Sequence, residues 1–136
     1  MRSRIAQSLR WVPFVAGAGT SLWVAAGLPH GRKPFEVDLM LSRESLALSM
    51  GKVPHYLSIA LLFGLACVAT GLRRPALAFG LTMLVGLGWE LAESTAIGHT
   101  ARAADLAPDL VAALACLLVL LVVRRWLPKP GNEILP

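Results

Sequence analysis

Charged residues are scarce in this sequence, and their scarcity argues against a soluble protein. Only 15% of the 136 residues are charged, 56% are hydrophobic, and the mean hydropathy is +0.64. A soluble domain carries about 25% charged residues, so this chain lacks the polar surface that water requires. We therefore expect a single membrane domain over residues 1–136.

Other features are also missing. Cysteine occurs only at Cys67 and Cys116, inside apolar stretches and at different depths, which favours packing residues over a disulfide. The 13 Lys and Arg residues stand at the ends of apolar stretches rather than along one face, which argues against nucleic acid as a partner. There is no His-Glu-x-x-His motif, and no Ser or Cys stands obviously beside a base. The sequence therefore names no cofactor.

Long apolar stretches are what the sequence has instead. A helix needs about 20 mostly apolar residues to cross about 30 Å of hydrocarbon. These stretches predict an all-α, polytopic bundle of four transmembrane helices, at residues 11–28, 53–72, 76–95 and 108–123. A long outer loop at 29–52 joins the first two helices. Within the loop, residues 37–50 mix leucines with charges, so we expect a short interfacial helix there.

The N-terminus is open to two interpretations. Residues 1–10 are basic, an apolar run follows, and residues 24–26 resemble a signal-peptide cleavage site. A cleaved signal would leave three spans, but the length of the run favours a first transmembrane helix. Five basic residues fall on the side of the outer loop and eight on the other side, namely Arg2, Arg4, Arg10, Arg73, Arg74, Arg124, Arg125 and Lys129. The positive-inside rule then places both termini in the cytoplasm.

Ionisable residues gather where three predicted helix ends would meet on the outer side. The candidate ligand-binding residues are Lys52, His55, Glu90, Glu93, Arg102, Asp105 and Asp109. A charged residue inside the membrane costs on the order of 2.5 to 3.5 kcal/mol unless it is paired or hydrated. Four acids face two cations and one histidine, so we expect a protonated acid, a metal ion or a positive ligand group to complete the balance. The alternative is simple ion pairing at the interface, above all for Glu93 and Asp109, and we expect His30 and His99 to be loop residues.

This pattern resembles the VanZ-like family of small membrane proteins over roughly residues 51–116. The family's Lys-x-x-His is matched at 52–55, and its Glu-x-x-Gln by Glu-Leu-Ala-Glu at 90–93. Its loop Arg corresponds to Arg102, and its Asp-x-x-x-Asn to Asp-Leu-Ala-Pro-Asp at 105–109. The family's acid, Gln, Asn and small Gly are replaced here by Gly51, Glu93, Asp109 and Ala112. Two amides have become acids, so this cluster is more negative than the family pattern. A sister family of inner-membrane proteins with a Trp-Glu-x-x-Glu helix is the next resemblance.

The resemblance implies a protein of the cell envelope in the bacterial cytoplasmic (inner) membrane, and a link to antibiotic resistance through the family's name-giving member, which lowers sensitivity to the glycopeptide teicoplanin. We expect a membrane lipid or an envelope precursor as the partner. In this hypothesis Lys52, His55 and Arg102 contact an anionic headgroup. Acids of the cluster hold these bases in place.

Two other hypotheses stay open. An intramembrane hydrolase would use His55 and Glu90 as catalytic acid and base, or His55, Glu90, Glu93 and Asp105 as metal ligands. A small accessory subunit of a larger membrane complex would use the cluster only to pair its own helices.

Overall fold

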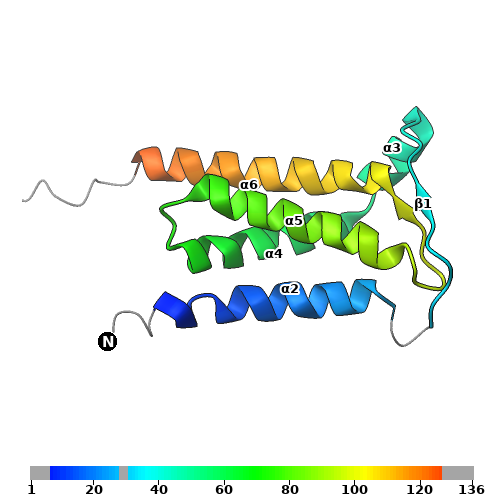
Figure 1. Cartoon of the computed structure of the whole chain (residues 1–136). Coiled ribbons are helices and arrows are strands. Elements are labelled where there is room, and N and C mark those ends of the chain that lie inside the picture. The colour runs from blue at the N-terminus through cyan, green and yellow to red at the C-terminus, as the bar shows by residue number, and fades with distance from the viewer. Residues whose placement is uncertain (1–6, 28–30, 127–136) are drawn as a thin grey trace, which may run out of the picture.

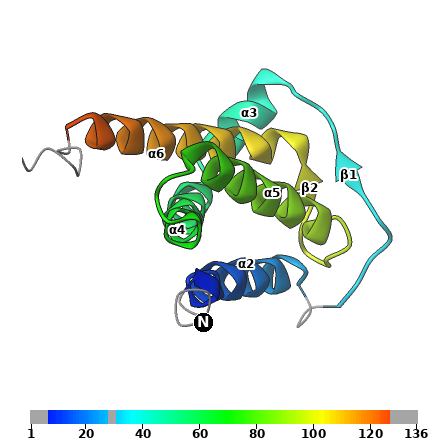
Figure 2. The same cartoon turned by 60° about the vertical axis from the view of Figure 1, so that its left-hand side comes forward.

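Four helices run alongside one another, with a small polar cap at one end. The computed structural model describes residues 7–27 and 31–126. The helices are α2 (Val12–Ala25), α4 (Val53–Thr70), α5 (Pro75–Glu93) and α6 (Leu106–Trp126). Figures 1 and 2 show them side by side, with the start of α2, the α4–α5 turn and the end of α6 at the end opposite the cap.

Proline marks the start of three of these helices. Pro13, Pro54 and Pro75 each lie in the first turn, of α2, α4 and α5 respectively. Proline lacks an N–H, and the first N–H groups of a helix have no partner within it, so proline loses nothing there. Its fixed φ angle also suits the helix.

The α4–α5 turn is closed by Gly71. This residue ends α4 in the left-handed conformation, with φ of 72°, which costs glycine little because it has no Cβ. The N–H of Leu72 then donates to the carbonyl oxygen of Cys67 (2.8 Å). The chain reverses within a few residues, so α4 and α5 are antiparallel neighbours.

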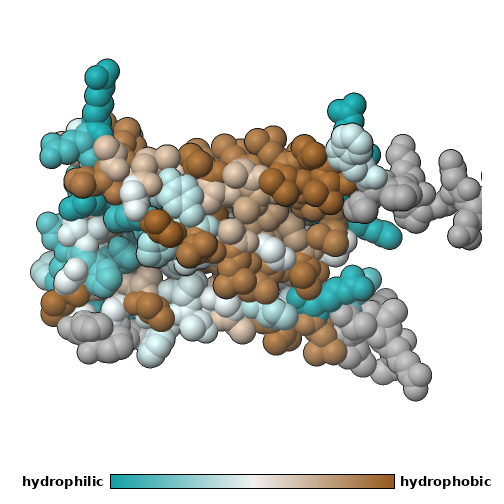
Figure 3. Space-filling view, turned by 180° about the vertical axis from the view of Figure 1, so that it is seen from behind, coloured by the Kyte–Doolittle hydropathy of each residue, from teal (hydrophilic) through white to brown (hydrophobic). Residues whose placement is uncertain are grey.

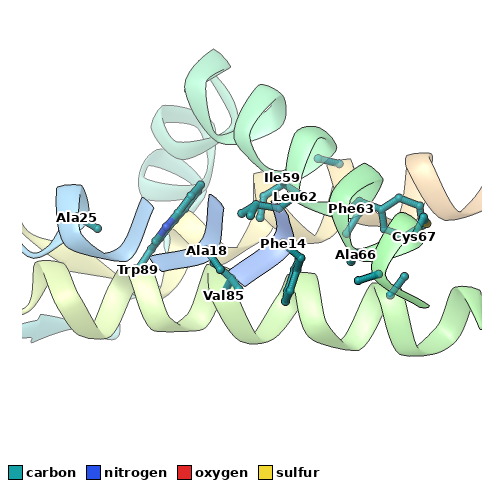
Figure 4. Close-up of a cluster of buried hydrophobic side chains, with 14 residues drawn as sticks. Phe14, Ala18, Ala25, Ile59, Leu62, Phe63, Ala66, Cys67, Val85 and Trp89 are labelled. Carbon is teal, nitrogen blue, oxygen red and sulfur yellow. The ribbon is translucent and has the colours of Figure 1, made fainter. Parts of the chain in front are cut away.

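The hydrophobic interior is built around α4, which contacts α2, α5 and α6. Ile59 and Ala66 of α4 are fully buried, and so are Ala78 of α5 and Ala113 of α6. Small residues at these positions let the helices approach closely. Figure 4 shows this cluster, with Trp89 among its labelled side chains. Cys67 and Cys116 are both free thiols that pack in or against it.

The cap is formed by the first loop and the loop before α6. Residues 31–38, here called the strap, run beside the end of α5: the N–H of Lys33 donates to the oxygen of Thr95 (2.8 Å), and that of Glu36 to the oxygen of Ser94 (2.9 Å). The strap ends in β1 (Val37–Asp38), which pairs in parallel with β2 (Ala101–Arg102). The sequence pattern predicted no strand here.

A short helix, α3 (Arg43–Met50), follows the strap. Ser42 caps it, since its side chain accepts a hydrogen bond from the N–H of Ser45 (3.0 Å). The helix contacts η2 (Ala103–Asp105), a 3-10 turn that leads into α6. It falls within the segment where a short helix was predicted.

Within residues 7–27 and 31–126, three helical stretches are long and apolar enough to cross a membrane: Val53–Thr70, Pro75–Glu93 and Ala103–Trp126. Figure 3 shows hydrophobic side chains over most of the bundle and hydrophilic ones gathered at its ends. The stretch Ala103–Trp126 is longer than the predicted span 108–123. The stretch Pro75–Glu93 ends two residues before the end of the predicted span 76–95. The helix in the first predicted span, α2, has 14 residues and is about 21 Å long, too short for the same criterion.

Some predictions fall outside the described residues. They concern the basic residues Arg2, Arg4 and Lys129, the last residue of the first predicted span, Leu28, and the loop residue His30.

Candidate functional site

The predicted meeting of three helix ends is present in the structure. The start of α4, the end of α5 and the start of α6 lie together at the capped end of the bundle (Figure 1). All the acidic residues within the described ranges lie toward this end: Glu36, Asp38, Glu44, Glu90, Glu93, Asp105 and Asp109. Antiparallel packing explains the convergence, because successive helices alternate direction.

Asp105 is the centre of one set of contacts. Its carboxylate is completely buried and accepts a hydrogen bond from Ser49 Oγ (2.5 Å) at Oδ1 and from Lys52 Nζ (2.5 Å) at Oδ2. Ser49 is itself fully buried in the last turn of α3, whereas the Lys52 side chain is 36% exposed. Asp105 therefore joins α3 and the start of α4 to the start of α6.

Asp109 forms a second pair one turn deeper. Its side chain is fully buried, and Oδ1 lies 2.8 Å from His55 Nδ1. The other oxygen, Oδ2, lies against Gly86 of α5, where an added Cβ would sit 2.7 Å away. A larger residue at position 86 would therefore force this carboxylate to move from its place between α5 and α6. The His55 ring meets the edge of Trp89 at a centroid distance of 5.9 Å.

Glu90 is held by the backbone rather than by a base. Its Oε2 accepts a hydrogen bond from the N–H of Arg102 (2.8 Å), so it anchors the loop that carries β2. Glu90 is 5% exposed. Within residues 7–27 and 31–126 its Oε1 has no hydrogen-bond partner, and neither do Asp109 Oδ2 and Trp89 Nε1. Each such buried atom costs on the order of 1 to 3 kcal/mol unless another polar group reaches it.

Glu93 faces a different neighbour, His99, whose Nδ1 lies 3.8 Å from Glu93 Oε1. Both residues line a pocket of about 330 Å³ between α2, α4 and α5, here called the side pocket, together with His55 and Trp89. The wall also contains apolar residues of α2 and α4, among them Val24 and Pro54.

The structure divides the seven predicted site residues into groups. Lys52 with Asp105 and His55 with Asp109 form direct pairs, and Glu90 contacts only the backbone of Arg102. The guanidinium of Arg102 forms no ion pair with any residue in the described part of the chain, and Glu93 is placed with His99 instead.

Sequence reasoning missed four contributors: Ser49, Gly86, Trp89 and His99. Ser49 stands three residues before Lys52 and Trp89 directly before Glu90, a proximity that is a usable signal. Gly86 and His99 gave no signal, because their roles depend on how α5 rotates and where its loop runs. The interpretation of His99 as only a loop residue overlooked its place in the side pocket.

The proposed metal ligands are not brought together as a metal site. Among the residues that the structure describes, no group of three His, Cys, Asp or Glu has a geometry that could hold a metal ion. His55 and Asp105 are instead each committed to another partner.

The chain was also compared with known proteins. No family model, curated protein or solved structure matches the chain. The VanZ-like resemblance therefore rests on the residue pattern alone and stays a prediction.

Proposed function

We propose that this chain is a VanZ-like integral membrane protein of the bacterial cell envelope that binds the headgroup of a membrane lipid or envelope precursor. The observation that carries the proposal is the side pocket, which adjoins the cluster of buried ionisable residues. It brings three ionisable side chains, His55, Glu93 and His99, beside an apolar wall. A contribution to glycopeptide resistance follows only from the resemblance.

The chemistry of the pocket fits an amphipathic ligand. Two imidazoles and a carboxylate offer both donors and acceptors to a polar headgroup. Val24 and Pro54 are exposed and apolar, and they offer a surface to the start of an acyl chain. Ligand pockets typically combine a mostly apolar lining with a few placed polar groups.

The contacts change the roles expected within the cluster. Lys52 is already bound by Asp105, so it serves the frame of the site rather than the ligand. His55 serves both the frame of the site and the ligand, because its Nδ1 contacts Asp109 and the residue also lines the side pocket. The groups of the side pocket left for a ligand are then His55, Glu93 and His99. Arg102 does not line this pocket.

The proposal includes four spans, an interfacial α3 and cytoplasmic termini. In its support, α2 packs against α4 and α5 along the bundle (Figure 1). Five arginines of the described residues lie at the end opposite the cap, and such an excess of basic residues is typical of a cytoplasmic face; they are Arg10, Arg73, Arg74, Arg124 and Arg125.

The test is native mass spectrometry of the full chain released in mild detergent, with the variant Glu93→Gln and the matched control Glu36→Gln. Glu36 is an exposed strap residue paired with Lys33, outside the side pocket. We expect wild type and Glu36→Gln to retain a lipid or precursor, and Glu93→Gln to lose most of it. Equal retention by all three proteins would contradict the proposal.

One observation favours a second function. The pairs Lys52–Asp105 and His55–Asp109 both join the start of α4 to the start of α6, as a purely structural clamp would. This is what the accessory-subunit hypothesis expects of the cluster. Partner chains in the same spectrum, without bound lipid, would support that function instead.

A further inference from the structure

A second polar cavity lies at the opposite end of the bundle from the cap. It has a volume of about 600 Å³ and is bounded by the start of α2, the end of α4 and the α4–α5 turn. Three arginines line it, Arg10 from the start of the chain and Arg73 and Arg74 from the turn. We call it the arginine cavity.

The charge in this cavity is of one sign. No acidic residue is among those lining it, and none of the ion pairs found within residues 7–27 and 31–126 involves Arg10, Arg73 or Arg74. A guanidinium presents a fork of N–H donors that matches phosphate oxygens in pairs. Three such groups around one cavity favour a phosphate group over a carboxylate.

Two helix starts add to the positive potential. Neither Trp11 at the start of α2 nor Arg74 at the start of α5 makes a side-chain capping hydrogen bond. The helix dipole places partial positive charge at the start of each helix, and this adds to the charge of the arginines. Both residues line the arginine cavity.

The rim of the cavity suits a lipid. Trp11 and Leu77 line it and are exposed, at 37% and 42%. Tryptophan is enriched at the level of membrane headgroups, and an exposed leucine one helical turn away from the arginines offers an apolar surface to acyl chains. A ligand with a phosphate at one end and hydrocarbon at the other would meet both surfaces.

We propose that the arginine cavity binds a phosphate group, supplied by an anionic membrane phospholipid or by free phosphate. The site lies on the face that carries most of the unpaired arginines, the face that an anionic cytoplasmic leaflet would contact. It shares no residue with the side pocket, so the two binding tests can fail separately. Its place on the cytoplasmic side rests on the orientation included in the proposed function.

The test titrates the purified full chain in neutral detergent with dioleoyl phosphatidylglycerol or dioleoyl phosphatidylcholine and counts bound lipid by native mass spectrometry. Millimolar sodium phosphate is added as a competitor in a separate arm. The variant is R73Q/R74Q. Its matched control is R124Q/R125Q, which removes the same charge from the same end of the bundle but outside the cavity. The single variant Arg10→Gln, from the other wall, covers the case in which the turn variant fails to fold.

We expect wild type to prefer phosphatidylglycerol. Each basic residue that contacts the anionic headgroup contributes a factor of about five, so R73Q/R74Q, which removes two such contacts, should bind roughly thirty-fold more weakly. The control should stay within about three-fold of wild type, and Arg10→Gln should lose about five-fold. Displacement of the lipid by phosphate would identify the phosphate group alone as sufficient, whereas resistance to phosphate would identify the lipid as the source. Equal losses in both double variants would overturn the proposal. Equal binding of the two lipids would also overturn it, because the choline of phosphatidylcholine neutralises the charge of its phosphate, whereas phosphatidylglycerol keeps a net negative charge.

Discussion

Asp105 shows, at the scale of single residues, how this protein tolerates buried charge. One of its oxygens has a neutral donor, Ser49, and the other has a charged donor, Lys52. Taking a carboxylate out of water costs several kcal/mol, which an ion pair offsets only when its geometry is good and the remaining lone pairs are satisfied. Removing only the cation of the pair therefore destabilises the protein more than replacing both charged residues.

We expect Lys52→Met to lower the free energy of unfolding by about 2 kcal/mol, because it leaves Asp105 buried without its cation. The value is below that of a fully buried pair because the Lys52 side chain is 36% exposed. The double variant K52M/D105N should recover most of the loss, since an amide still accepts from Ser49. The measurement is a denaturant titration in detergent.

The matched control is Lys33→Met, at a lysine whose partner Glu36, 2.9 Å away, is 68% exposed and so stays in contact with water, unlike the fully buried Asp105. Exposed pairs contribute less than about 1 kcal/mol. If Lys52→Met cost no more than Lys33→Met, or if the double variant were less stable than the single one, Asp105 would not be the group that needs Lys52.

At the scale of helices, the approach of α5 to α6 depends on Gly86. An added Cβ there would lie 2.7 Å from Oδ2 of the fully buried Asp109, so this carboxylate, whose Oδ1 lies 2.8 Å from His55 Nδ1, would have to shift. We expect Gly86→Ala to lower the free energy of unfolding by about 1 to 3 kcal/mol, as overpacking does. It should also loosen the contact between Asp109 and His55.

Gly80 gives the control on the same helix, because nothing lies within 4 Å of a Cβ added there. Gly80→Ala should be neutral or stabilising by up to about 1 kcal/mol through helix propensity. The same denaturant titration compares the two variants. A Gly86→Ala protein as stable as Gly80→Ala would show that α5 and α6 are farther apart than the structure places them.

The helices and their meeting point could be predicted from the sequence, but the partners could not. Apolar length gave the three long helices, and antiparallel order placed Lys52, Glu90 and Asp105 at one end. Which base meets which acid depends on the rotation of each helix about its axis, and a spacing of three or four residues leaves that open. The β1–β2 pair was not predictable, because strands of two residues carry no periodicity.

At the scale of the whole molecule, the arrangement in the membrane depends on α2, which is shorter than the other helices of the bundle. It is 14 residues long and packs along α4 and α5, and residues 7–9 just before it are also helical. A full crossing needs about 20 residues. If α2 and the preceding turn together cross the membrane, Gln7 and Glu44 lie on opposite sides of it.

We expect membrane-impermeant maleimide to label Glu44→Cys in intact bacterial cells, and Gln7→Cys and Leu72→Cys only after permeabilisation. Each cysteine is introduced into a chain whose Cys67 and Cys116 have been replaced by alanine. Leu72 is the internal control, because α4 separates it from Glu44 and is long enough to span. Labelling of Gln7→Cys from outside, with Leu72→Cys protected, would show that α2 does not cross.

The parallel pairing of β1 with β2 also sets an order of events during synthesis. β1 precedes α4 and α5 in the chain, and its partner β2 follows them. The strap therefore lacks its hydrogen-bond partners, the end of α5 and β2, until the α4–α5 hairpin has been inserted and the loop after it lies on the same side. The cap can therefore form only after α4 and α5 have been inserted. A chain arrested before that point would present the unpaired backbone groups of β1, which are open to pairing with another chain.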